Sequence, residues 1–364
     1  MNSFSGSGKI KVLVITPTLE CGGAERFVSL LCNHINANDL RLHLAVINNK
    51  NQFYNITNPE VQISDLGINR VSRSFFKLRK LIRTENPDVV LTTANHLNLY
   101  VAVFKPFFPK KMIWVARETS VVSMNAQYAR QPALYNFLLK SFYRNLDHII
   151  CQSAYMQRDL IKNYGIDFNK TSIIYNATDP DLKYFDGQVT QNSFITVARL
   201  SAEKGIDRIL KTTATLNIPF NYYIAGDGPE KQKLQALAKS LGIQAQVHFI
   251  GQRQNPFAGY EDCQAFLMGS LYEGFPNAVI EANAIGIPVV AIKSPGGIGE
   301  VVVDGYNGFL TTEGTDFRNK ILLSTSFPFN RKNISESTSE KHSIRKMKES
   351  ITALFLKLSG LKKK

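Results

Sequence analysis

The stretch EGFPNAVIEANAIGIPVVA, residues Glu273–Ala291, decides the fold of its half of the chain. Its first residues read as a loop, a helix starts near Pro276, and Gly286 ends that helix before a buried apolar strand. Loop, helix and strand in this order make one unit of a parallel α/β sheet. The stretch also holds two glutamates, Glu273 on the loop and Glu281 more than a turn inside the helix.

Short apolar strands alternate with helical stretches on both sides of this unit. Repeated βα units predict a parallel sheet covered by helices, and a restart of the pattern after the Pro- and Asp-containing linker 176–192 predicts a second sheet. The fold class is therefore α/β, with two Rossmann-like, doubly wound domains facing a cleft. The strands are predicted at 11–16, 42–47, 88–92, 112–116, 148–151 and 172–175, then at 194–198, 221–225, 247–250, 265–268 and 288–291.

The domains are predicted at residues 1–180 and 181–330, followed by a basic segment at 331–364. Residues 327–339 are polar and read as irregular, whereas 344–358 reads as an amphipathic helix. A chain of 364 residues with 44% hydrophobic and 20% charged residues suits two folded domains.

The composition predicts a cytoplasmic protein. No apolar run approaches the roughly 18 residues of a membrane-spanning helix, and the first residues lack the features of a signal peptide. The four cysteines neither pair as CxxC nor space like a metal site. The stretch GSGK at Gly6–Lys9 precedes the first strand, so its context excludes a phosphate-binding loop.

The formal net charge of +14 is unevenly divided along the chain. Residues 1–180 hold 21 basic and 12 acidic side chains, residues 181–330 hold 12 and 14, and residues 331–364 hold 10 and 3. Such asymmetry indicates an anionic partner surface, membrane or nucleic acid. The sequence contains no base-reading element, so nucleic acid is disfavoured.

Two basic segments of the first domain are laced with aromatic residues, Arg70–Arg83 and Phe104–Lys111, and the chain ends in LSGLKKK. Lysines, arginines and aromatic side chains together suit an anionic membrane interface. The alternative is that Phe75, Leu78 and Ile82 face the core and that the cations are merely solvated.

Three loops that follow strands carry the candidate binding groups. Gly22 and Gly23 stand between the first strand and a helix, where they admit a phosphate or simply make a tight turn. Arg199 and Lys204 share the loop VARLSAEKG, and two cations beside a helix N-terminus can cradle a diphosphate. The loop around Gly226 leaves the next strand toward the same edge.

The two glutamates allow two interpretations. A glycoside hydrolase needs its carboxyl groups to flank one glycosidic bond, roughly 5 to 9.5 Å apart. Alternatively, two carboxylates can each accept paired hydrogen bonds from vicinal hydroxyls of a ribose or a hexose. Because Glu273 precedes the helix and Glu281 lies inside it, the pattern favours two anchors on one ligand.

Five motifs together resemble a known family: GGAER, VARLSAEKG, IAGDGP, EGFPNAVIEANAIGIPVVA and GGIGEVVVDGYNGFL. In this order they resemble the retaining family-4 glycosyltransferases of the GT-B fold, whose signature is Glu-x7-Glu. The resemblance covers residues 10–310. It implies a nucleotide-sugar donor held mainly by the second domain, no cofactor and no metal, with UDP-sugars favoured over GDP-sugars. It also implies that the final helix packs back against the first domain.

The resemblance assigns roles by position. Arg199 and Lys204 would neutralise the diphosphate, with a glycine of the first domain closing on it. Glu273 would bind the transferred sugar, and Glu281 the ribose. The family's usual proposal lets a phosphate oxygen take the acceptor's proton, so no protein nucleophile is implied. The catalytic set is thus Arg199, Lys204 and Glu273, and the donor-binding set is Gly22, Gly23, Gly226, Phe275, Pro276, Asn277 and Glu281.

This chain departs from many relatives at one position. Where they carry a histidine after a strand of the first domain, it has Arg117 and Glu118. Acceptor handling would then fall to Arg117, Glu118 and His96, although a structural or solvent-exposed role is the simpler interpretation of His96 alone.

The resulting hypothesis is a retaining hexosyltransferase that adds a hexose or N-acetylhexosamine to a lipid-linked glycan of O-antigen, capsule or lipopolysaccharide. It would act on the cytoplasmic face of the inner membrane, bound to the anionic surface. The alternatives are a soluble acceptor or a catalytically silent nucleotide-sugar-binding protein. An epimerase is disfavoured because a histidine-rich site is not apparent. Oligomeric state does not follow from the sequence.

Overall fold

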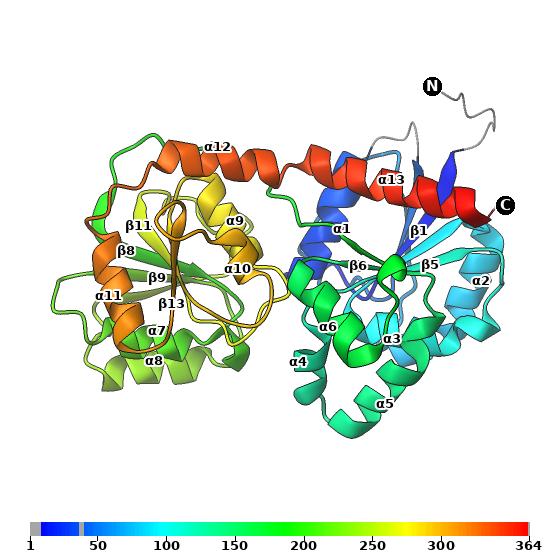
Figure 1. Ribbon diagram of the computed structural model, residues 1–364, viewed down its shortest axis with the longest axis horizontal. Helices are drawn as coiled ribbons and strands as arrows, with labels where there is room; N and C mark the ends of the chain where they lie inside the picture. The colour runs from blue at the N-terminus through cyan, green and yellow to red at the C-terminus, as the bar shows by residue number, and fades with distance from the viewer. Residues whose placement is uncertain (1–8, 36–39, 363–364) are drawn as a thin grey trace. The chain divides into compact units, whose positions relative to one another are not determined.

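The computed structural model describes residues 9–35 and 40–362 (Figure 1). Residues Gly6–Gly8 of the GSGK stretch and the last two lysines of the basic C-terminal segment lie outside the described residues. The chain divides into two compact units, of which the second is Thr178–Ser343 and the first comprises the residues up to Ala177 and those from Ile344 onward. The second unit thus begins at Thr178 instead of the predicted 181, and it ends at Ser343 instead of 330.

The first unit is built on a parallel sheet of seven strands in the order β3-β2-β1-β4-β5-β6-β7. The sequence analysis missed the edge strand β3. Sheet order reverses at β1, which pairs with both β2 and β4, and this is the switch point of a doubly wound fold. The strands are β1 (Ile10–Thr16), β2 (Leu40–Val46), β3 (Gln62–Asp65), β4 (Val89–Thr93), β5 (Ile113–Arg117), β6 (His148–Cys151) and β7 (Thr171–Ile173).

Helices connect these strands and cover both faces of the sheet. Figure 1 shows α13 running beside α1, and buried side chains of both helices, such as Val28 and Ile351, belong to one apolar cluster. The other face carries a second cluster around Trp114. The helices are α1 (Gly23–His34), α2 (Phe75–Glu85), α3 (Asn95–Phe104), α4 (Val122–Gln127), α5 (Pro132–Phe142), α6 (Ala154–Tyr164) and α13 (Ile344–Lys362), with short 3-10 turns η1 (Val71–Arg73), η2 (Lys105–Phe107), η3 (Tyr143–Asn145) and η4 (Phe168–Lys170).

The second unit repeats this plan with six parallel strands in the order β10-β9-β8-β11-β12-β13. Its switch point lies at β8, between β9 and β11. The strands are β8 (Thr190–Val197), β9 (Asn221–Ala225), β10 (Val247–Gly251), β11 (Cys263–Met268), β12 (Val289–Ile292) and β13 (Gly308–Thr311). The helices are η5 (Ala202–Lys204), α7 (Ile206–Thr213), α8 (Lys231–Ser240), α9 (Asn277–Ala284), α10 (Ile298–Val301), α11 (Thr315–Ser324) and α12 (Arg331–Lys341).

The prediction of two Rossmann-like parallel sheets is confirmed, and the prediction of an irregular segment at 327–339 is wrong over most of its length. Residues Arg331–Lys341 form α12, whose first turn is capped because Asn330 accepts a hydrogen bond from the backbone N–H of Asn333 at 3.0 Å. Ile334 is fully buried, and the Ser335 hydroxyl donates to the carbonyl of Ala284 in α9. Packing against α9 therefore stabilises a helix whose own sequence is a weak helix former. Of the described helices, none is both long enough and apolar enough to cross a membrane.

Candidate active site

The second unit gathers its charged loops at the switch point of its sheet. The loop after β8 carries Arg199 and Lys204, and the loop after the neighbouring strand β11 carries Ser270 and Glu273. In an open parallel sheet, ligands bind beyond the carboxyl ends of the strands at this point. Side chains that are distant in sequence thus meet at the expected place.

Lys204 and Glu273 form an ion pair, with Nζ 2.7 Å from Oε1. The Ser270 hydroxyl donates to the same oxygen at 2.8 Å. The two charged side chains keep 23% and 15% of their surface exposed, so both are largely withdrawn from water yet reachable by a ligand. The sequence analysis predicted both residues, but it missed Ser270, whose position directly after a buried strand was the available signal.

A close approach of two glycines brings these loops together. Gly205 has φ +57°, and a Cβ atom placed there would lie 2.1 Å from the carbonyl oxygen of Gly269. A Cβ atom at Gly269 would in turn lie 2.3 Å from the carbonyl oxygen of Gly205. Only glycine fits this contact, which fixes Lys204 beside the end of β11.

The backbone of Glu273 is also fixed by the loop that follows β12. Its N–H donates to the carbonyl of Pro295 at 3.0 Å, and Gly297 donates to the carbonyl of Gly274 at 3.2 Å. Gly296 has φ +119°, and a Cβ atom there would come within 1.5 Å of the Glu273 carbonyl oxygen. Gly296 and Gly297 therefore fix the backbone of Glu273, while Lys204 and Ser270 hold its side chain.

Arg199 lies nearer to solvent than Lys204. Its guanidinium contacts the Oε1 atom of Glu203 at 2.6 Å while its side chain stays 67% exposed. Burial disfavours the charged form of Glu203, but hydrogen bonds from Ser201 and Arg199 outweigh it and lower the pKa of this carboxyl. Arg199 is therefore held by one acid on its own loop, which the sequence analysis did not single out.

The remaining predicted donor-binding residues of this unit line the same edge of the sheet. Phe275 and Pro276 are buried ahead of α9, Asn277 begins that helix, and Glu281 is 4% exposed within it. Gly226 follows β9, and its N–H donates to the carbonyl of Gly251 at 2.8 Å.

In the first unit, Gly22 and Gly23 stand where they were predicted, at the start of α1. Gly22 has extended backbone geometry and precedes the first residue of the helix, Gly23. The Gly22 carbonyl accepts the N–H of Arg26 at 2.9 Å, and Thr18 donates to Glu25 at 3.2 Å across the turn. This helix begins directly after β1, at the switch point of the first sheet.

Arg117 ends β5 as a fully buried cation. Its guanidinium carbon lies 3.6 Å from the centre of the Phe27 ring in α1, and one terminal nitrogen donates to Asn176. Within the described residues, Nε and Nη1 have no hydrogen-bond partner. Burial lowers the pKa of Arg117 to about 9, although the charge of Glu118 opposes this shift.

Glu118 follows Arg117 and is equally buried. Its Oε1 atom accepts hydrogen bonds from Asn98 at 2.8 Å and from the Tyr143 hydroxyl at 3.0 Å. Burial raises the pKa of this carboxyl to about 7. Because neither side chain of this pair reaches solvent, contact with an acceptor would require rearrangement of the surrounding residues.

His96 is the third acceptor-side candidate, and the structure does not bring its side chain into this network. It is exposed in the first turn of α3, whereas Asn98 two residues later is buried and donates to the Arg117 carbonyl at 2.9 Å. Gln152 completes the network by donating to the Glu118 carbonyl at 2.7 Å. No sequence pattern pointed to Asn98 or Gln152, since polar residues on apolar helices and strands are ordinarily solvated.

A lysine–glutamate ion pair thus lies beyond the switch point of a doubly wound sheet, the place where ligands commonly bind in this architecture. Comparison with known proteins identifies the class. Residues 21–182 match the family model "Glycosyltransferase Family 4", and residues 185–340 match "Glycosyl transferases group 1". A Campylobacter jejuni N-acetylgalactosamine-N,N'-diacetylbacillosaminyl-diphospho-undecaprenol 4-alpha-N-acetylgalactosaminyltransferase is 30% identical over 82% of this chain and 85% of its own length. The chain belongs to this family and is a glycosyltransferase.

Other relatives and solved structures agree with this assignment. The O-antigen biosynthesis glycosyltransferase WbnH of Escherichia coli is 24% identical over 82% of this chain and 84% of its own length. The lipopolysaccharide outer core galactosyltransferase WaaB superposes with a TM-score of 0.74 at 20% identity, over 96% of this chain and all of that one. Anabaena HepE in complex with UDP superposes with a TM-score of 0.77 at 21% identity, over 96% of this chain and all of that one. At these identities the superpositions establish the fold.

Proposed function

We propose that this glycosyltransferase moves a hexose or N-acetylhexosamine from a nucleotide-diphosphate sugar to a lipid-linked glycan, with retention of the anomeric configuration and without a metal. The observation that carries the proposal is the Lys204–Glu273 ion pair at the switch point of the second sheet. Both partners are held by backbone constraints, and both stay partly exposed.

A nucleotide sugar offers each partner of this pair a better contact. Its diphosphate oxygens accept charge-assisted hydrogen bonds from the Lys204 ammonium and the Arg199 guanidinium. Its sugar hydroxyls can donate to the Glu273 carboxylate once Lys204 turns to the phosphate. Fixed cations at the departing diphosphate stabilise the charge that develops there as the glycosidic bond breaks.

The other residues hold the donor. Glu281 binds the ribose hydroxyls, Gly226 and the backbone of Phe275 to Asn277 line the nucleotide and the sugar, and Gly22 or Gly23 closes on the diphosphate. The acceptor hydroxyl attacks the face that the nucleotide leaves, and a phosphate oxygen takes its proton. UDP is favoured over GDP, supported by the UDP found with the Anabaena protein of the same fold.

The acceptor is proposed from the relatives and from charge. The name of the Campylobacter jejuni relative described above includes a diphospho-undecaprenol-linked glycan. A second relative from the same organism, an alpha-1,4-N-acetyl-D-galactosaminyltransferase, also has a PP-undecaprenol-linked glycan in its name. Residues 1–180 carry 21 basic against 12 acidic side chains, which suits an anionic inner-membrane surface on its cytoplasmic face. His96 remains the exposed candidate for acceptor contact, while Arg117 and Glu118 support the end of β5 from within.

The test is transfer of radiolabelled sugar from a panel of UDP- and GDP-sugars into the lipid phase of a bacterial extract. The wild type is compared with Lys204→Ala and with the control Lys211→Ala. Lys211 lies on α7 and pairs with Asp207 at the surface, with 59% of its side chain exposed. We expect one donor to label lipid, about a 100- to 1,000-fold loss in Lys204→Ala, and full activity in the control.

Other results would contradict parts of this proposal. Label that enters only water-soluble products would move the acceptor to a soluble molecule. Binding of UDP-sugar without transfer to any fraction would favour a catalytically silent nucleotide-sugar-binding protein.

A further inference from the structure

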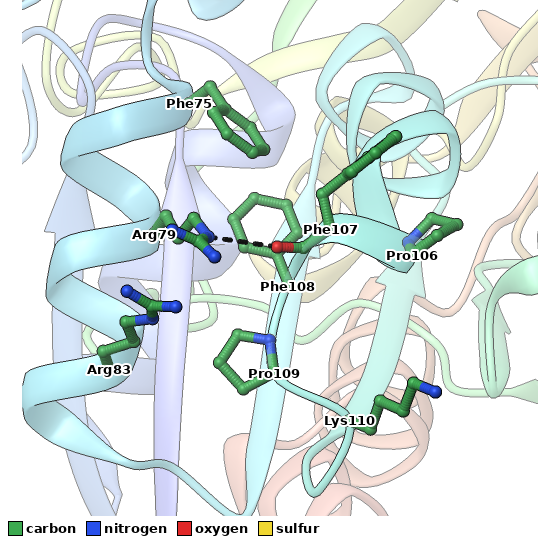
Figure 2. A pocket seen from close by; sticks show the side chains of 8 residues that line it. All are labelled: Phe75, Arg79, Arg83, Pro106, Phe107, Phe108, Pro109 and Lys110. Carbon is green, nitrogen blue, oxygen red and sulfur yellow. Dashed lines mark hydrogen bonds between the residues drawn. The ribbon is translucent and has the colours of Figure 1, made fainter.

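A groove on the first unit lies between the helix α2 and the turn that follows α3 (Figure 2). Residues predicted as two separate basic segments thus form one hollow of about 640 Å³. The apolar residues Leu78 and Ile82 face the core, each 1% exposed, as the alternative interpretation of the first segment required. The groove is lined by Phe75, Arg79, Arg83, Pro106, Phe107, Phe108, Pro109 and Lys110.

The charges around this groove have one sign. Arg79 and Arg83 lie one turn apart on α2, and Figure 2 shows the Arg79 guanidinium turned toward the segment of Phe107 and Phe108. Arg79 is oriented by a hydrogen bond from Nε to the Phe107 carbonyl at 3.1 Å. Within residues 9–35 and 40–362, the side chains of Arg83 and Lys110 make no hydrogen bond or ion pair, and no acidic residue is among those that line the groove.

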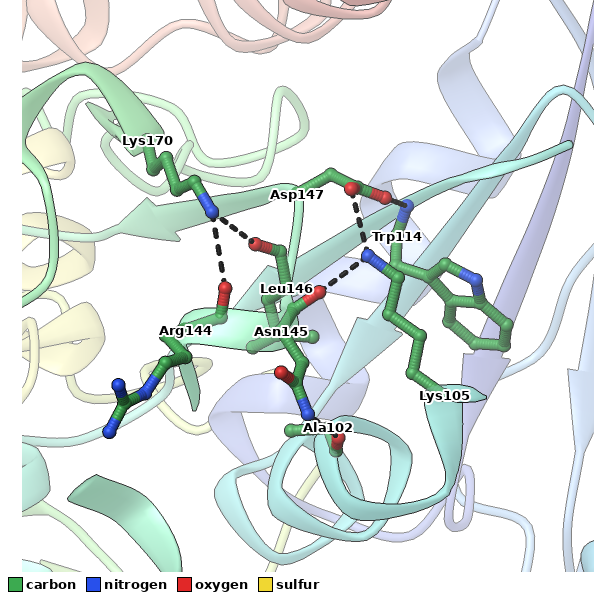
Figure 3. Close-up of polar contacts among 8 residues, drawn as sticks. All are labelled: Ala102, Lys105, Trp114, Arg144, Asn145, Leu146, Asp147 and Lys170. Carbon is green, nitrogen blue, oxygen red and sulfur yellow. Dashed lines mark hydrogen bonds and ion pairs between the residues drawn. The ribbon is translucent and has the colours of Figure 1, made fainter. Parts of the chain in front are cut away.

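Like charges one helical turn apart repel each other, so this arrangement is unfavourable without an anion. The neighbouring Lys105 shows the contrast (Figure 3). Its ammonium contacts Asp147 Oδ1 at 2.8 Å and the Asn145 carbonyl, and Asp147 also accepts the N–H of Trp114 at 2.8 Å. One lysine of the turn is thus neutralised inside the unit, whereas Lys110 faces outward.

The Lys105 contacts also make the groove wall rigid. They tie the first residue of η2 to the segment that leads into β6, and the ring of Phe108 packs 5.1 Å from Trp114 and 5.4 Å from Phe75. A binding site whose walls are already in place loses little entropy when it is filled. The groove is therefore preformed.

Two large apolar side chains are exposed here: Phe107 lines the groove, and the Phe76 ring lies 5.4 Å from the ring of Phe75, which also lines it. Phe107 is 62% exposed and Phe76 is 82% exposed. Exposed aromatic rings beside cations are unfavourable in water but match the headgroup and acyl boundary of an anionic bilayer. A soluble phosphate compound would satisfy the arginines and leave these rings in water.

We propose that this groove binds the phosphate of an anionic phospholipid headgroup, with Arg79 and Arg83 on its two unesterified oxygens and Phe107 and Phe76 entering the acyl boundary. The inference rests on the proposed membrane-linked function and deepens it, because it names the lipid class and the residues that hold it. Arginine pairs recognise phosphate through parallel hydrogen bonds.

The test is sedimentation of the full chain with vesicles of phosphatidylcholine alone or of phosphatidylcholine mixed with phosphatidylglycerol. The variant Arg79→Gln/Arg83→Gln is compared with Arg158→Gln/Lys162→Gln. The control pair has the same spacing on α6 of the same unit, is exposed, and removes the same charge. We expect the phosphatidylglycerol mixture to bind wild type, the groove variant to lose about 10- to 30-fold in partition, and the control to lose less than about threefold.

Three outcomes would overturn the proposal. Equal losses in both double variants would mean that diffuse charge binds the vesicles. Undiminished binding of the groove variant would place the lipid contact elsewhere. Calorimetric binding of glycerol phosphate without vesicle binding would assign the groove to a soluble phosphate.

A parallel assay of sugar transfer to detergent-solubilised lipid extract separates this inference from the proposed function. If transfer persists while vesicle binding fails, only the groove assignment is wrong. If wild type transfers no sugar to lipid in detergent, the proposed function fails whatever the vesicles show.

Discussion

A cation and a carboxylate lie close together at two places in this glycosyltransferase, and the two places differ in their contacts and in their access to solvent. Lys204 and Glu273 form a direct ion pair whose side chains remain 23% and 15% exposed. Arg117 and Glu118 are both fully buried within a network that includes Asn98. Both pairs were predicted as site residues, yet only the first can exchange its partner for a ligand without disturbing the core.

The difference in solvent access determines how much free energy is needed to separate each cation from its carboxylate. A partly exposed pair costs little to separate, because water or ligand oxygens replace the lost contacts. Removing one member of a buried pair leaves an uncompensated charge in a medium that cannot solvate it. We therefore assign substrate chemistry to Lys204 and Glu273, and support of the end of β5 to Arg117 and Glu118.

The largest effect is expected for Arg117→Met, which removes the hydrogen bond to Asn176 and the contact with the Phe27 ring and takes a cation away from the neighbourhood of Glu118. We expect the free energy of unfolding to fall by about 3 kcal/mol at neutral pH, measured by urea denaturation, because a buried charge-assisted hydrogen bond and a cation–π contact are lost. The double variant Arg117→Met/Glu118→Gln should recover part of this loss only above neutral pH, where Glu118 in the single variant would otherwise have to ionise without a nearby cation. A loss below about 1 kcal/mol in the single variant would mean that the pair is solvated, like the donor-side pair.

The second-largest effect is expected in the pH dependence of stability, which should contain a component from the buried Glu118. Burial raises the pKa of Glu118 to about 7, so the stability it contributes is present at low pH and is lost as pH rises through that value. From about pH 5 to pH 8 the loss should be about 2 kcal/mol. In Glu118→Gln this component should vanish, and urea midpoints measured across that range should show a flatter profile. An identical profile in the variant would contradict the raised pKa.

A smaller effect is expected at the glycine contact that holds the donor-side pair. Gly205→Ala places a methyl group against the Gly269 carbonyl, in addition to its strained φ of +57°. Gly242→Ala is the control, since Gly242 has φ +73° and nothing within 4 Å of its would-be Cβ. We expect Gly205→Ala to be less stable than the control by about 1 to 2 kcal/mol and to lose transferase activity, whereas the control should keep its activity. Equal stability and activity would show that the close approach is dispensable.

The sequence predicted that Lys204 and Glu273 follow two strands of the second sheet, because the signals for this placement are local. Strand, glycine turn, cation and helix follow one another within a few residues around Lys204, and the same holds around Glu273. The direct pairing of these two residues was not predicted, since it joins positions 69 residues apart through the contact of Gly205 with Gly269.

The features that sequence reasoning missed depend on tertiary packing. The edge strand β3 (QISD) is polar and mostly exposed, so it lacks the apolar run of a buried strand, and the edge strand β13 (GFLT) begins with a glycine, which disfavours strands. Helix α12 forms on α9 in spite of its polar sequence. Charged residues are rarely fully buried, so nothing in the sequence predicted that Arg117 and Glu118 would be. The groove beside α2 likewise joins two segments that were interpreted separately.

The most direct test of the contrast between the pairs is calorimetric binding of the UDP-sugar donor to Lys204→Ala and Glu118→Gln beside the wild type. We expect Lys204→Ala to raise the dissociation constant of the donor by about tenfold or more, because a charge-assisted contact is lost, while Glu118→Gln stays within about twofold of the wild type. Unchanged affinity in Lys204→Ala, or an equal loss in Glu118→Gln, would contradict it.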